Sequence, residues 1–156
     1  MFRFLHSGTS VRVKGHLEVF KNGKRVVNKH NLVVDTGFND IIRTNMLNLE
    51  ADADHVDGCR YVAVGTGTTA AAAGDTALGT ETAVSGLSRA LGTYTEPATK
   101  QGRVAKTFSV TGTVAVTEAG LLNAAAAGIL LNRQVFAAVN VVSGDELTIQ
   151  YTFTLS

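Results

Sequence analysis

Short stretches of the chain alternate between apolar and polar residues, as a β-strand does when one face is buried and the other is wet. From Val11 to Val19 the odd positions are Val, Val, Gly, Leu and Val, and the even positions are polar or charged. The dipeptide Asn22-Gly23 then favours a two-residue hairpin turn. A return strand is therefore expected at 24–28, and further strands are expected at 32–34, 104–116, 119–122, 129–136 and 146–155.

One segment carries helical rather than strand periodicity. Between Gly37 and Leu49, four apolar residues recur at helical spacing: Phe38, Ile41, Ile42 and Met46. Asp35 or Thr36 can cap the free amides of a first turn. We expect one α-helix over about residues 37–49.

A long excursion follows the apolar run at 61–64. Residues 65–101 are dominated by Ala, Gly and Thr and show little periodicity, so we expect an extended surface segment. Several short strands with turn signals and one helix favour a mainly β fold, an antiparallel β-sandwich or open barrel. The length of 156 residues fits a single β-rich domain over 1–156, with an N-terminal arm at 1–10.

Composition predicts a folded, soluble chain. Hydrophobic residues make up 45% and charged residues 17%, which is enough for a packed core. The single cysteine, Cys59, cannot form an intrachain disulfide, and the first residues lack the apolar stretch of a signal peptide. The longest apolar run, 124–131, is far shorter than the roughly 20 residues of a membrane span. We expect a protein made in a cytoplasm, with no membrane partner.

Charge is distributed unevenly, although the net charge is only +1. Residues 1–30 contain seven basic side chains and one acid, Glu18. This basic section either docks on an acidic partner or nucleic acid, or forms the solvated face of a hairpin. Direct nucleic-acid binding is not expected, because the strand lacks interleaved aromatic residues for base stacking. The candidate partner contacts are Arg3, Arg12, Lys14, Lys24 and Arg25.

The sequence GTGTTA at 65–70 fits the dinucleotide-binding pattern G-x-G-x-x-G/A. Its context does not fit, because Gly74-Asp75 would stop a helix started by the preceding alanines. No second parallel strand follows, and no acid is placed to hold a ribose. A phosphate loop would also need a Lys-Ser/Thr pair after Gly67. We interpret the motif as a structural loop.

Other candidate chemistry is equally incomplete. The acidic loop at 51–58 misses the spacing of a calcium loop, which leaves a solvated loop or a weak adventitious site. Its metal-capable residues are Asp52, Asp54, His55 and Asp57. Cys59 lies beside Arg60, which favours a lowered thiol pKa, but no His or Asn constellation accompanies it, so we expect an ordinary buried or half-buried thiol. We expect no enzyme activity, no cofactor and no small-molecule substrate.

Three segments of the chain resemble a family of small virion proteins of tailed bacteriophages. They are NLVVDTGFNDIIRTNML (31–47), YVAVGTGTTAAAAGDTALGTE (61–81) and VTEAGLLNAAAAGILLNRQVF…VVSGDELTIQYTFTLS (116–156). In the family pattern a VGTGTT loop, a GDTAL element and a TEAGL strand occur in this order. Similar glycine and Glu-x-Gly-Leu elements are found in the N-terminal domains of phage tail fibres.

The resemblance implies a structural virion protein without catalysis. The expected function is capsid decoration, in which a homodimer or homotrimer binds the major capsid protein on the surface of the assembled head. The alternative is a tail-fibre or baseplate adaptor that contacts tail proteins. The chain shows no coiled coil, collagen-like repeat or receptor-binding domain, which favours decoration. The resemblance also implies that Glu81, Arg89 and Glu118 form a charge network pinning the excursion to the sheet.

Overall fold

Nine β-strands build the part of the protein that the structure, a computed structural model, describes: residues 13–37 and 58–155. They are β1 (Val13–Lys21), β2 (Lys24–Val33), β3 (Tyr61–Gly65), β4 (Ala90–Leu91), β5 (Thr93–Thr95), β6 (Gln101–Ser109), β7 (Val114–Leu122), β8 (Leu130–Val141) and β9 (Glu146–Leu155). Within these ranges no helix is long and apolar enough to cross a bilayer.

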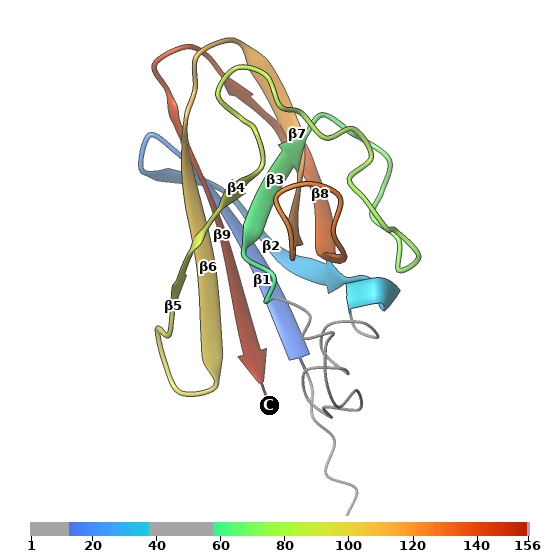
Figure 1. The fold of residues 1–156 in the computed structure, drawn as a ribbon. Coiled ribbons are helices and arrows are strands. Elements are labelled where there is room, and N and C mark those ends of the chain that lie inside the picture. Colours follow the sequence, from blue (N-terminus) through green and yellow to red (C-terminus); the bar gives the residue numbers. More distant parts are fainter. Residues whose placement is uncertain (1–12, 38–57, 156) are drawn as a thin grey trace, which may run out of the picture.

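The strands form one antiparallel sheet that curls into a nearly closed barrel (Figure 1). Their order is β4-β3-β7-β8-β2-β1-β9-β6-β5. The two terminal strands of this order, β4 and β5, are consecutive in the chain and are separated only by Gly92. The ends of the sheet therefore meet, and the expected mainly β fold is confirmed in its barrel-like form.

Gly92 permits this closure. Its amide donates a hydrogen bond to the carbonyl oxygen of Arg60 at 2.7 Å. A Cβ at this position would lie 2.6 Å from Cγ1 of Val104, so the strand can turn from one half of the barrel to the other only without a side chain.

The barrel interior is filled by the inward positions of the alternating strands. In β9, Leu147, Ile149 and Tyr151 are fully buried, while Thr148 and Gln150 between them are partly exposed. Strand β7 differs, because it is buried at every position from Val116 to Leu122. A second, smaller core covers its outer side, where Leu78 of the excursion packs with Val34, Ala63, Leu122 and Leu130.

The expected helix at 37–49 lies outside the described residues except for Gly37. The described range 13–37 ends in a helical turn at 35–37 (Figure 1), but the described residues contain no complete helix, so the one-helix prediction is not confirmed. Gly37 itself is buried against β8, since a Cβ there would lie 2.6 Å from Cα of Leu131.

The expected bounds of several segments need correction. The strand expected at 119–122 is part of β7, and the one expected at 129–136 continues in β8 to Val141. The single strand expected at 104–116 is two strands, because β6 ends at Ser109 and β7 begins at Val114. Between them, the amides of Val110 and Thr111 bond to the carbonyls of Asp145 and Ser85, which holds a turn in place. The strands expected at 24–28 and 32–34 are one strand, β2. The excursion at 65–101 is interrupted by β4 and β5, which are too short to show periodicity.

Candidate functional site

The glycine loop after β3 folds around a buried carboxylate of the same chain. Glu118, on β7, is paired with Gly65 of β3 and is 0% exposed. Its Oε1 accepts hydrogen bonds from the amides of Gly67 at 3.0 Å and Thr80 at 2.6 Å. Its Oε2 accepts one from the amide of Gly79 at 2.9 Å. Two amides of the glycine loop are thus used inside the fold, since that of Gly67 bonds to Glu118 and that of Thr66 bonds to the carbonyl of Thr80.

The close approach of Glu118 explains the glycines. A Cβ on Gly65 would lie 2.6 Å from Oε1 of Glu118, and one on Gly67 would lie 2.8 Å from its carboxyl carbon. Both distances are shorter than real Cβ contacts allow. The expected structural loop is therefore what the geometry shows, and the G-x-G spacing follows from a side chain that lies 51 residues further along the chain.

Arg133 of β8 completes the cluster and ties in the next part of the excursion. Its Nε donates to Oε2 of Glu118 at 2.7 Å, and a terminal nitrogen donates to Asp75 at 2.7 Å. The other terminal nitrogen donates to the carbonyl of Thr69 at 3.0 Å. The Arg133 side chain is only 3% exposed. We call Glu118, Arg133 and Asp75 the buried charge cluster.

The cluster is held in its ionised form. Burial alone would raise the pKa of Glu118, but the amides of Thr80 and Gly79 and the Arg133 guanidinium together lower it below its ordinary value. The amide of Ala72 and the Arg133 guanidinium also lower the pKa of Asp75. Burial would lower the pKa of Arg133, but its bonds to Asp75 and Glu118 raise it. Each charge therefore depends on the others.

These shifts predict acid sensitivity. A carboxyl whose pKa is depressed on folding stabilises the protein above its unfolded pKa, and this contribution is lost as pH falls through the folded pKa. We expect the melting temperature to fall below about pH 4.5, the ordinary pKa of Glu118. In Glu118→Gln the dependence on pH should be shallower, since one titrating group is gone. Thermal melts of both proteins from pH 7 to pH 3 measure this, and parallel curves would contradict it.

The structure divides the expected network of Glu81, Arg89 and Glu118 into two parts. Arg89 and Glu81 form a bidentate ion pair at 2.6 and 2.9 Å. Arg89 also donates to the carbonyls of Ala124 and Ala127, and so joins the excursion to the β7–β8 loop. Glu118 does not belong to this pair, because its cationic partner is Arg133.

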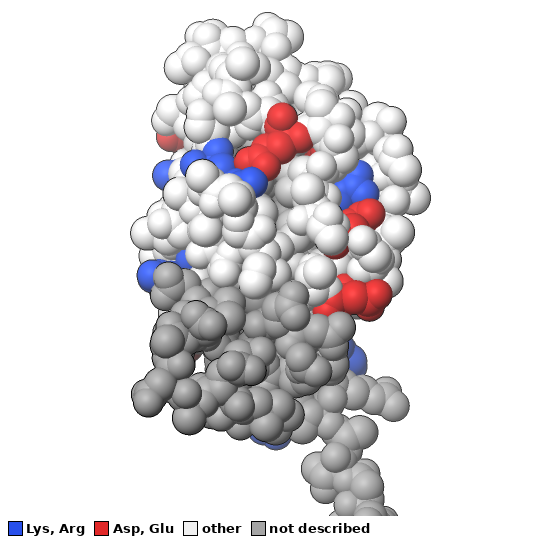
Figure 2. Space-filling view, turned by 45° about the vertical axis from the view of Figure 1, so that its right-hand side comes forward, with Lys and Arg blue, Asp and Glu red and all other residues white. Residues whose placement is uncertain are grey.

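Charged residues lie in small mixed groups on a largely uncharged face (Figure 2).

Sequence reasoning missed Arg133 and Asp75. Asn132 and Arg133 follow two buried leucines in β8, and both polar residues are themselves buried. A buried arginine requires a buried partner, so these two polar residues were the available signal. Asp75 lies within the GDTAL element, which carries part of the family resemblance.

The candidate partner contacts are only partly described. Arg3 and Arg12 lie outside the described residues. Lys14 and Lys24 are exposed on β1 and β2. Arg25 donates to Glu18 at 2.7 Å, so its charge is partly neutralised. The metal-capable residues at 52–57 also lie outside the described ranges, within which no group of three or more His, Cys, Asp or Glu side chains is placed to hold a metal ion.

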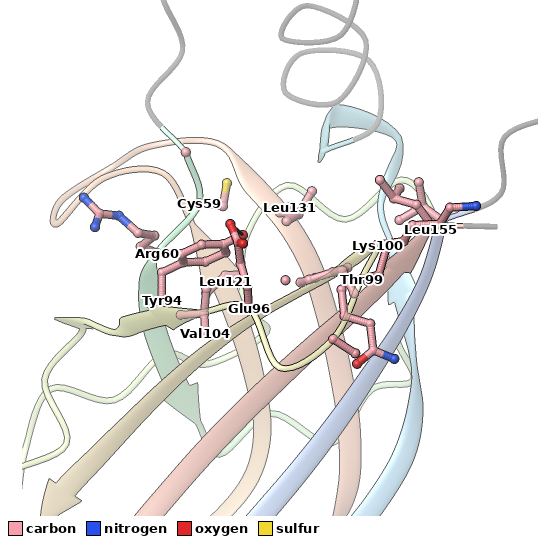
Figure 3. A pocket seen from close by; sticks show the side chains of 16 residues that line it. Cys59, Arg60, Tyr94, Glu96, Thr99, Lys100, Val104, Leu121, Leu131 and Leu155 are labelled. Atoms are coloured by element: carbon pink, nitrogen blue, oxygen red, sulfur yellow. Dashed lines mark hydrogen bonds between the residues drawn. The ribbon is translucent and has the colours of Figure 1, made fainter.

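A cavity of about 1060 Å³ opens at the end of the barrel where β1 begins and β9 ends. Its lining includes the apolar residues Val104, Leu121 and Leu131, and Figure 3 shows Tyr94 and Arg60 on one side, opposite Lys100 and Leu155. Cys59 lies in this wall, and burial raises its pKa to about 12. Cys59 is therefore the ordinary buried thiol that the sequence predicts, protonated at neutral pH, and Arg60 does not lower its pKa.

Comparison of the chain with models of known protein families, with curated proteins and with solved structures found no match.

Proposed function

We propose that this protein is a structural component of a bacteriophage virion, a decoration protein that binds the assembled head and ties neighbouring capsid subunits together. One observation carries the proposal. The elements on which the family resemblance rests, VGTGTT, GDTAL and TEAGL, meet at the buried charge cluster through Gly67, Asp75 and Glu118. The shared pattern is thus the device that fastens the excursion to the barrel.

The arrangement of the surface supports a binding role. The Arg133–Asp75 ion pair holds the excursion to the barrel, and Arg89 of the excursion donates hydrogen bonds to the carbonyls of Ala124 and Ala127. Together the two segments present a large, mostly uncharged loop surface in a fixed shape. Rigid loops on a β scaffold suit contacts with other proteins, since little conformational entropy is lost on binding. In this proposal the protein acts as a homodimer or homotrimer on the outside of the shell.

Co-sedimentation with phage particles tests the proposal. The purified protein should pellet with expanded, undecorated heads and should stay in the supernatant with isolated tails. Saturation at a fixed ratio to the major capsid subunit would indicate specific sites. Protein that ignores heads and pellets with tails would contradict decoration and favour the tail-adaptor alternative. Protein that pellets with neither would contradict both virion functions.

A further inference from the structure

Within residues 13–37 and 58–155, strand β2 has a backbone edge that no other strand pairs with along most of its length. On one side it pairs with β1 from Lys24 to Asn31. On the other side it pairs with β8 only at Leu32 and Val33. Among the described strands, none covers residues 24–31 on that side. The peptide groups of this edge are available to another extended chain.

Two lysine side chains reach from β1 and β2 to backbone carbonyls of β8, on the side where β2 and β8 are not paired. Lys29 is the cross-strand neighbour of Leu17, which is 0% exposed, so the Lys29 side chain starts from the inner face of the sheet. Its Nζ donates to the carbonyl of Val135 on β8 at 3.2 Å. Lys21 donates to the carbonyl of Asn140 on β8 at 2.8 Å. Lys29 is on the edge strand β2 and Lys21 is on its neighbour β1. An inward-pointing lysine on an edge strand, such as Lys29, disfavours indiscriminate pairing with other strands.

The positive charge of this edge favours some binding partners over others. The unpaired segment carries Lys24, Arg25 and Lys29 and no acidic residue. Two copies of β2 placed side by side would bring these like charges together, which disfavours a second copy of this chain. An acidic strand would instead meet complementary charge at Lys24 and Lys29, whereas Arg25 already pairs with Glu18. Val26, 44% exposed, offers an apolar contact within it.

We propose that the free edge of β2 binds an extended acidic segment of a partner protein by β-strand addition. The backbone of residues 24–31 provides the hydrogen bonds, and Lys24 and Lys29 bind carboxylates on the incoming strand. The identity of the partner as a shell subunit rests on the proposed function, whereas strand addition itself does not. Strand addition also gives the basic N-terminal section a specific role in binding, which the number of its charges alone did not indicate.

The test uses the full chain and a synthetic peptide of ten residues, the length of β2, with alternating Thr and Glu. Amide hydrogen exchange, read residue by residue, should slow at 24–31 when this peptide is added. A matched peptide of alternating Thr and Lys should have no effect. Equal protection by both peptides, or unchanged exchange at 24–31 with the acidic one, would overturn the proposal. Protection that grows with protein concentration alone would also overturn it, because a second copy would then be the occupant.

Charge variants separate the edge from general electrostatics. Lys24→Glu with Lys29→Glu should weaken binding of the acidic peptide by about tenfold or more. Lys100→Glu with Lys106→Glu changes the net charge equally on residues away from this edge, so it should change the affinity less than about twofold. Lys24→Glu alone, at an exposed position beside the hairpin turn, gives the edge variant that retains the fold if the double variant melts early. Equal losses in edge and control variants would refute the proposal.

Amide exchange measured on the protein bound to phage heads distinguishes strand addition from the proposed function. If the protein pellets with heads but its 24–31 amides exchange as in the free protein, strand addition is wrong and decoration stands. If the acidic peptide protects the edge but heads do not bind, strand addition stands and the shell is not the partner.

Discussion

Replacing Glu118 by glutamine is expected to lower the free energy of unfolding by about 3–5 kcal/mol. Each carboxylate oxygen accepts two hydrogen bonds, Oε1 from the amides of Gly67 and Thr80, and Oε2 from Gly79 and Arg133. A glutamine would place an NH₂ group against two donors, whichever way its amide is turned. It would also leave the 3% exposed Arg133 with Asp75 as its only carboxylate partner in the cluster. Removing one member of a buried ion pair leaves the other charge buried without compensation.

Glu81→Gln is the matched control for this variant. It also removes one negative charge from an arginine–carboxylate pair. This pair lies within the excursion, however, and the Glu81 side chain is 31% exposed. Solvent can replace much of what is lost, so we expect a cost of about 1 kcal/mol or less. Urea unfolding of the three proteins, with midpoints and slopes compared, measures both effects. Equal losses in the two variants would show that the buried charge cluster has no special role.

Gly67→Ala is expected to cost about 1–3 kcal/mol through overpacking. The added methyl group would meet the Glu118 carboxylate, so its cost should largely disappear in a Glu118→Ala background, where that carboxylate is absent. Gly65→Ala differs, because its Cβ also collides with the backbone carbonyl of Thr80. Its cost should persist in the Glu118→Ala background, since a backbone atom cannot be removed by the second substitution.

Gly74→Ala controls for the entropy of glycine in this loop. No atom lies within 4 Å of a Cβ built at that position, so the substitution should be nearly neutral. A double-mutant cycle in urea gives the coupling energy between residues 67 and 118. If Gly67→Ala and Gly65→Ala were as neutral as Gly74→Ala, the glycines would not be required by the carboxylate.

Elements with a clear period were predictable from the sequence. β9 alternates strictly, and the hairpin at Asn22-Gly23 has the positive φ angles of 51° and 76° that the dipeptide favours. β4 and β5 contain two and three residues and were not predictable, because a period of two cannot be seen over so short a run. The turn after Ser109 was hidden because valines continue the alternation through it, and its amides are held by loops distant in sequence.

The candidate site was predictable in part. Glu118 and the glycine loop stand out in the sequence, and the context around the loop already argued against a nucleotide. Glu118 was grouped with Glu81 and Arg89, whereas its cationic partner is Arg133. Sequence spacing cannot tell which arginine a folded sheet brings to a given carboxylate. Irregular pairing between β7 and β8, with register shifts near Glu118 and Leu121, sets Arg133 beside it. Such shifts leave no simple mark in the pattern of residues.

The central claim is that this protein works by binding other virion subunits on the phage head. If a phage encodes the chain, as we propose, the most direct test separates purified virions of that phage into heads and tails and quantifies this chain in each fraction by mass spectrometry. Decoration predicts that the chain is found with the heads, in a fixed ratio to the major capsid protein. Its presence in the tail fraction alone, or its absence from the particle, would contradict the claim.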